Sequence, residues 1–290
     1  MSRRPSISVL FALTLAGSLP AQEQAIITID ENLDDAVEQI DVIIKFGFGK
    51  IKIERGNPSK AVTGFIQYYD EMIAPDISYR GNKSTAVFRL ETKMSQEGWG
   101  FSRWRDFDEY DMPESELYFT TRVPLDIQFS CGLGEAELDL GDLLISDANI
   151  ENGLGATLIN FSSLNKVVMR RLSVDNGLGE LRASNLSNAN TTRYRFSSGL
   201  GDADLDFGGE LLHDIQVDAN IGLGSMTFRI PRIHNVELEA KDSFLSTIDT
   251  PGMVQVRRGL YRSRDYDSSK PTIFISANIG LGSIRIIWTD

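Results

Sequence analysis

The stretch LDIQFSCGLGEAELDL at residues 125–140 holds the pattern that decides the fold. Apolar and polar residues alternate on both sides of its Gly-Leu-Gly tripeptide, which is typical of a β-strand with one buried face. The tripeptide occurs six times, and residues 47–49 carry a Gly-Phe-Gly variant. The motifs between 132 and 222 start 21 to 24 residues apart, a period that indicates a stacked repeat. The glycines of the six copies are Gly132, Gly134, Gly153, Gly155, Gly177, Gly179, Gly199, Gly201, Gly222, Gly224, Gly280 and Gly282.

The parity of the alternation changes across each motif. In the first full copy, Ile127 and Phe129 occupy odd positions before the first glycine, whereas Ala136 and Leu138 occupy even positions after it. A continuous strand would keep one parity, because its side chains alternate with a period of two. We therefore expect an extra residue or a bend at the glycines, which are structural corners. The leucine between them is expected to point inward and to stack on its copies.

Two all-β architectures fit units of strand, corner and strand. In a single-chain β-solenoid, like a parallel β-helix, each unit of about 22 residues is one rung stacked on the next. In an antiparallel β-sandwich, each motif would be a hairpin turn, and Asn152-Gly153 and Asn176-Gly177 resemble hairpin signals. The regular period favours the solenoid, because an unchanging leucine would be unusual at a solvated hairpin tip.

The first 21 residues have the pattern of a secretory signal peptide. Arg3 and Arg4 form a positive start, residues 7–17 are apolar, and residues 18–21 form a small-residue exit. We expect cleavage near Ala21 and a periplasmic or extracellular location. Nothing later is long and apolar enough to span a bilayer, so no integral membrane segment is expected.

The mature chain would be strongly acidic. The full sequence has a formal net charge of −12, and residues 1–21 contain two arginines and no acids, so their removal leaves −14. That charge opposes binding to nucleic acid or to an anionic membrane surface. Cys131 is the only cysteine, which excludes an internal disulfide. It is expected to be a small buried residue and no nucleophile, because neither histidine is near it in sequence.

Residues 22–122 form an N-terminal β-rich segment with one atypical stretch. Several short alternating runs are separated by turn residues. Residues 97–116 then mix aromatic and acidic residues without a clear period. This aromatic crossing is expected to cap the first coil, to bind a partner, or both. Its candidate binding residues are Trp99, Arg103, Trp104, Arg105 and Phe107.

Residues 123–290 are expected to form the Gly-Leu-Gly solenoid, with an insertion around residues 232–271. The last two motifs start 58 residues apart, which leaves room for one degenerate rung and additional chain. Four arginines at 257, 258, 262 and 264 form a basic island in the insertion. A solvated loop is the preferred interpretation of this island.

Few residues suggest catalysis. Outward-facing acids alternate along two copies, and a polysaccharide-active β-helix enzyme could use such a face. No aromatic sugar-binding residues are interleaved with these acids. Neither a nucleophile elbow nor a phosphate-binding loop is present, and the two histidines lack metal-ligand spacing. We therefore expect no catalytic residue, metal or cofactor, and the enzyme remains the alternative. The acids are Glu135, Glu137 and Asp139 in the first full copy and Asp202, Asp204 and Asp206 in the fourth.

The whole pattern resembles the toast-rack family of bacterial envelope domains. The resemblance rests on DVIIKFGFGKIKIERG at residues 41–56, the aromatic crossing, VPLDIQFSCGLGEAELDL at residues 123–140 and the serial Gly-Leu-Gly units. This family is related to adhesin-like domains and to the sensory part of LiaF-type envelope stress regulators. The resemblance implies a right-handed β-solenoid, an exported protein and no catalytic residues to carry over.

The expected function is therefore that of a non-catalytic, exported β-solenoid. It would act as a binding, scaffold or envelope-stress-sensing module, with an envelope protein or a glycan as its partner. The sequence leaves the identity of that partner and the oligomeric state open.

Overall fold

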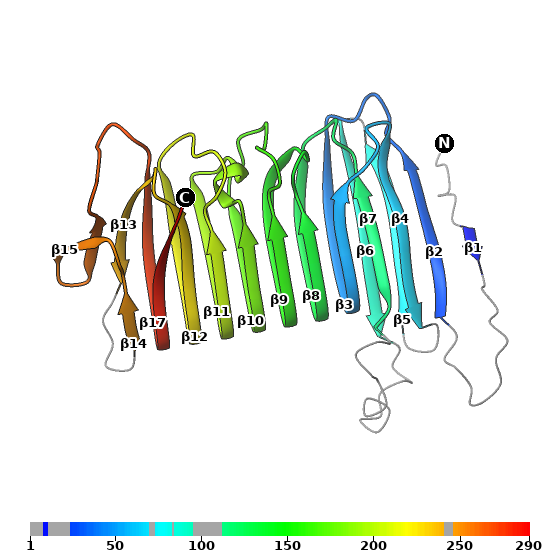
Figure 1. Ribbon diagram of the computed structural model, residues 1–290. Helices are drawn as coiled ribbons and strands as arrows, with labels where there is room; N and C mark the ends of the chain where they lie inside the picture. Colours follow the sequence, from blue (N-terminus) through cyan, green and yellow to red (C-terminus); the bar gives the residue numbers. More distant parts are fainter. Residues whose placement is uncertain (1–7, 11–23, 70–72, 83, 95–111, 241–245) are drawn as a thin grey trace, which may run out of the picture.

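A computed structural model describes residues 8–10, 24–69, 73–82, 84–94, 112–240 and 246–290 (Figure 1). These residues form one long stack of β-strands, with a single 3-10 helix, η3 (Leu186–Ala189). The strands run side by side across the whole length of the molecule (Figure 1).

Seven long strands build the body of the stack, and each carries one copy of the glycine motif. Neighbouring strands in this group pair in parallel and in register. The parallel pairing confirms the β-solenoid and excludes the antiparallel sandwich. In spatial order the strands are β3 (Gln39–Arg55), β8 (Leu125–Asp139), β9 (Ile145–Asn160), β10 (Leu172–Ser184), β11 (Arg193–Asp206), β12 (Ile215–Pro231) and β17 (Thr272–Thr289).

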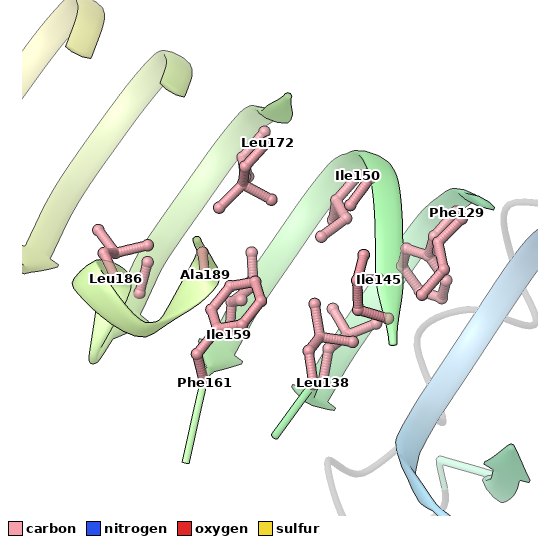
Figure 2. Packing of buried hydrophobic residues seen from close by; sticks show 14 of the residues in the cluster. Phe129, Leu138, Ile145, Ile150, Ile159, Phe161, Leu172, Leu186 and Ala189 are labelled. Carbon is pink, nitrogen blue, oxygen red and sulfur yellow. The ribbon is translucent and has the colours of Figure 1, made fainter. Parts of the chain in front are cut away.

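The core lies inside the bend of these strands. Side chains before the corner meet side chains after it, and the connecting segments close the remaining side (Figure 2). Equivalent residues stack on one another: Phe129 pairs in register with Ile150, and Leu138 with Ile159. All four are almost completely buried. Burial of each such side chain contributes about 1.5–3 kcal/mol, so the stability of the stack comes from repeated rows of apolar residues.

Each corner depends on a glycine that no other residue can replace easily. The second glycine of every motif has a positive φ, for example 142° at Gly134 and 141° at Gly201. A Cβ at Gly201 would also lie 1.8 Å from the carbonyl oxygen of Gly179 in the preceding rung. Both the backbone conformation and the close approach of the rungs therefore require glycine.

The prediction that the central leucine points inward is wrong. In the first full copy, Cys131 and Gly134 are buried, whereas Gly132 is exposed and Leu133 is half-buried. Two consecutive residues thus face outward, as in a β-bulge. The pair of consecutive outward residues is Gly132-Leu133 and not Gly134-Glu135, which places the leucine on the outside. The leucines do stack in register, but they stack on the outer edge of the corner.

Antiparallel strands extend the N-terminal end of the stack. On the side before the corner, β6 (Thr85–Met94) pairs with β3, and β5 (Ile73–Asn82) pairs with β6. On the other side, β7 (Glu114–Phe119) pairs with β3, and β4 (Lys60–Tyr69) pairs with β7. Beyond β4 follow β2 (Gln24–Asn32) and β1 (Ser8–Leu10), both antiparallel to their neighbours.

At the C-terminal end, the last strand of the chain does not form the last rung. β17 lies between β12 on one side and the shorter strands β13 (Asn235–Ala240) and β14 (Ser246–Asp249) on the other. A hairpin of β15 (Met253–Arg257) and β16 (Leu260–Ser263) then pairs with β13 (Figure 1). β13 and β14 therefore supply the terminal rung, and β15 and β16 form an antiparallel cap over it.

We expect Gly201→Ala to lower the free energy of unfolding by about 3 kcal/mol or more, because it adds both backbone strain and a clash with the neighbouring rung. Gly81→Ala is the matched control, since its φ is not in the positive region and its nearest atom would be 3.9 Å away. Urea denaturation of both variants measures the difference. Equal midpoints would contradict the proposed role of the corner.

Candidate functional site

The most unusual surface feature is a straight row of exposed leucines along the corner. We call it the outer leucine ladder and define it as Leu154, Leu178, Leu200, Leu223 and Leu281. Each lies in register with the next, and each is 44–49% exposed. Adjacent strands are about 4.8 Å apart, so the row is about 19 Å long. Single exposed leucines are ordinary, whereas a contiguous row of them is a candidate interaction surface.

The chain covers the beginning of this row with its own residues. Phe48 takes the leucine's place in the first rung, and only 3% of it is exposed. It lies in a small apolar cluster with Ile27 of β2 and Tyr68 and Tyr69 of β4. Leu133, in the second rung, packs at the edge of this cluster. The capping strands thus bury the first position of the row, and the ladder starts where their cover ends.

The acidic faces lie on the outside of the stack, after the corner, and carry charges of both signs. Glu180 and Arg182 stand beside Asp202 and Asp204 in register, as expected for stacked rungs. Arg229 Nε donates to both carboxylate oxygens of Asp204, at 2.9 and 3.0 Å.

Neighbouring rungs also engage other members of these faces. Asp202 accepts a hydrogen bond from the backbone N–H of Ser225 at 3.1 Å. In the first full copy, Glu137 stands in register with Lys52 of β3. On this outer surface, the acids thus lie beside basic or hydrogen-bond-donating groups of the neighbouring rungs.

Cys131 lies inside the corner and is 3% exposed. Burial raises the pKa of its thiol to about 12. A thiol of this kind is protonated at neutral pH and is a poor nucleophile.

Behind Cys131 a short polar row continues through the next rungs. Asn152 Nδ2 donates to Thr157 Oγ1 at 2.9 Å, and Thr157 Oγ1 donates to Asn176 Oδ1 at 3.3 Å. Both asparagines and Thr157 are almost completely buried. The row therefore belongs to the interior of the corner and offers nothing to a ligand outside.

The basic island belongs to the C-terminal cap. Arg257 and Arg262 lie on the strands of the β15–β16 hairpin, whereas Arg258 lies in its exposed turn and Arg264 in the exposed turn after β16. Arg262 Nη2 lies 2.6 Å from Glu237 of β13, and Arg257 lies 3.3 Å from Glu239 of the same strand. The guanidinium of Arg262 also lies 4.6 Å from the centre of the Tyr266 ring. At least two of the four arginines thus fasten the hairpin to the terminal rung.

The five candidate binding residues of the aromatic crossing, from Trp99 to Phe107, lie outside the described residues. Within the described part, no group of three or more His, Cys, Asp and Glu side chains could hold a metal ion. The same residues include no helix that is long and apolar enough to cross a membrane.

Sequence reasoning missed the ladder as a surface, although a signal for it was present. The parity change is compatible with two places for the extra residue, before or after the leucine. Only the first places the leucine outside. A polar residue is the usual choice at an outward position. The repeated leucine was therefore the signal in the sequence for an apolar outer row.

The fold and this surface define a class of protein: a capped, parallel β-solenoid with an apolar row on its outer edge. Residues 18–183 match the family model described as the N-terminal domain of toast_rack, so the chain belongs to that family.

The search of curated proteins gives no match. One similar solved structure is described as that of "a putative cell adhesion protein from Clostridium sporogenes". It is 15% identical to this chain, with a TM-score of 0.46, and the alignment covers 99% of this chain and 100% of the other.

The outward direction of the ladder can be tested by stability. Leu200→Asn should change the free energy of unfolding by about 1 kcal/mol or less, because the side chain is already half exposed. Leu205→Ala, five residues later and fully buried, should cost about 2–5 kcal/mol. Urea denaturation distinguishes the two. A large loss in Leu200→Asn would mean that the leucine supports the core.

The raised pKa of Cys131 predicts low reactivity. In the native protein near pH 8, iodoacetamide should modify this thiol at least a hundred times more slowly than free cysteine, because almost none of it is thiolate. In urea the rate should become that of free cysteine. Mass spectrometry measures both rates, and rapid native labelling would show that the corner opens.

Proposed function

We propose that this protein is a non-catalytic, exported binding module of the bacterial cell envelope. In this proposal the outer leucine ladder is the docking surface and the partner is a protein. The observation that carries the proposal is the contiguous exposure of five stacked leucines on a rigid edge.

The proposed location is supported by the sequence before the first rung. Residues 1–21 have the charge and hydropathy pattern of a cleaved leader. Membership of the toast-rack family agrees with an envelope location, because the domains that the sequence resembles are found there.

The ladder suits a protein better than a glycan. Its side chains provide no hydrogen-bond donors or acceptors, whereas sugar recognition relies on convergent polar groups around an apolar surface. A stacked apolar row instead matches the periodic apolar side chains of a polypeptide. These leucines leave 44–49% of their surface to solvent, and the repetition of an apolar residue at such places supports a role in binding.

The acidic face supports the non-catalytic part of the proposal. A general acid and a general base on a glycosidase need a cleft between them for the sugar and water. Here Asp204 is held by Arg229, and Asp202 by the next rung. These contacts are typical of acids that join neighbouring rungs.

Site-specific crosslinking tests the docking surface. A photoreactive benzoylphenylalanine replaces Leu200 in the mature chain, which is mixed with an envelope extract. Irradiation should give a discrete crosslinked protein band, because the ladder contacts a protein partner.

Two controls define the site. The same group at Gln128, an exposed residue before the corner, should give no such band. The band at position 200 should also disappear when Leu178 and Leu223 are changed to Asn. Equal crosslinking from both positions, or a band that survives the leucine changes, would remove the ladder as the docking surface.

A further inference from the structure

The charge beside the ladder points to the chemistry of its partner. Resting on the proposed function, we propose that the ladder binds a basic amphipathic α-helix, which lies along the corner with an apolar stripe on the leucines and Lys or Arg on both sides of that stripe.

Two rows of residues border the ladder, one before the corner and one after it. Successive members of each row stand in register on neighbouring strands. The first row holds Ser130, Glu151, Asp175, Ser197, Asn220 and Asn278, and the second holds Glu135, Ala156, Glu180, Asp202, Ser225 and Ser283. Beside the five leucines of the ladder these rows contain four carboxylates and no cation, and the fifth carboxylate, Glu135, stands beside Leu133 in the preceding rung. A partner that covers the leucines therefore meets acids on either side.

The acids concentrate around the middle of the stack. Glu151, Asp175, Glu180 and Asp202 are all exposed and surround the stretch from Leu154 to Leu200. The nearest cations stand one place further from the ladder, where Arg182 donates to Glu180 and Arg195 is exposed on β11. Charge complementarity thus favours cationic groups beside the apolar stripe of the partner.

The covered first rung has the opposite charge. Lys45 and Lys50 occupy the two bordering places beside Phe48, where the chain's own strands bury the row. The bordering acids begin at Glu135, in the second rung. Charge therefore changes from positive to negative at the point where the row becomes available to another molecule.

The spacing of the rungs favours a helix over an extended strand. The five leucines span about 19 Å at about 4.8 Å per rung. A helix presents one apolar residue per turn of about 5.4 Å, so four turns advance about 22 Å. A strand repeats on one face every 6.7 Å or so, and four repeats would advance about 27 Å. Only the helix keeps its side chains near the leucines along the whole row.

The area argues against a second copy of this chain as the occupant. A strip about 19 Å long and about 10 Å wide covers about 200 Å². A stable interface buries about 800 Å² on each partner. Two copies would also bring their bordering carboxylates together, which is repulsive. A basic helix fits the width of the strip and the charge of its borders, and an interface of this size is a weak, reversible one.

Designed peptides test this chemistry on the mature chain. The first is a helical peptide of about 18 residues with leucines at the i, i+3, i+4 and i+7 places and lysines beside them. The second carries glutamates in place of the lysines, and the third is the first with its residues scrambled. Fluorescence anisotropy should show binding of the first peptide at least tenfold tighter than either of the others. Its affinity should fall about tenfold between about 50 and 500 mM salt.

Variants of the protein assign the binding to the ladder. The double variant Leu178→Asn, Leu200→Asn should bind the lysine peptide at least tenfold more weakly, because the apolar row is interrupted. Asp175→Asn, Glu180→Gln and Asp202→Asn together should weaken it and flatten its salt dependence. The matched control changes three exposed acids far from the ladder, with Glu38→Gln, Glu210→Gln and Asp265→Asn, and should retain the affinity.

Several outcomes would overturn the proposal. Equal binding of the scrambled peptide would reduce the effect to general attraction between charges, and equal binding of the glutamate peptide would remove the charge argument. Ladder-dependent self-association in the ultracentrifuge would identify a second copy as the occupant. Ladder-dependent flotation with anionic phosphatidylglycerol vesicles would identify a membrane.

The two proposals fail in different ways. If no peptide binds but the crosslink at position 200 persists, the basic helix is wrong and the protein-docking function stands. If the crosslink is also absent, both proposals fail.

Discussion

The close approach of glycine backbones at the corner sets the geometry of every repeated rung. A Cβ on the second glycine of a motif would lie within 2 Å of the carbonyl oxygen in the rung before, as at Gly134 and Gly201. The same contact recurs along the whole stack, so every rung must bend at the same level. In-register strands, stacked core rows and the straight outer edge all follow from that shared level.

The ends of the stack pose a different problem. A parallel rung leaves unpaired backbone groups and open core on its outer side, which invites further strands. Here antiparallel strands take over at both ends: β5 and β4 at one, and β16 at the other. The described cap strands carry no Gly-Leu-Gly motif. Gly64 of β4 nevertheless repeats the geometry of the corner glycine, with a φ of 144° and a Cβ that would lie 2.0 Å from the carbonyl oxygen of Glu116 in β7. The close approach that shapes the body therefore recurs in the N-terminal cap.

The rungs also have two distinct sets of positions, those that face the core and those that face solvent. Inward positions are apolar in rung after rung, because the core is continuous. Outward positions vary freely in charge, as Glu180, Asp202 and Ser225 show in successive rungs. The leucine is the exception among the outward places, since it recurs in successive rungs although about half of it is exposed. The solenoid thus has outward-facing residues of varied charge and, among them, one regular apolar row. This combination suits a binding surface.

The repeat, the bend and the parallel stack were all predictable from the sequence, because the spacing of Gly-Leu-Gly and the parity change are local patterns. The acids of β10 and β11 were also placed correctly, since stacking follows directly from the repeat. The direction of the leucine side chain was not predictable. The extra residue can lie before or after the leucine, and the two arrangements differ only in which backbone groups meet the next rung. The position of β17 between β12 and β13 was equally hidden. β12 and β17 pair although their glycine motifs start 58 residues apart, and such a non-local pairing leaves no local pattern in the sequence. Local sequence patterns were thus enough to predict a single rung. Which side of the corner faces solvent, and which strand closes the stack, depend on contacts between rungs, and no local pattern records those contacts.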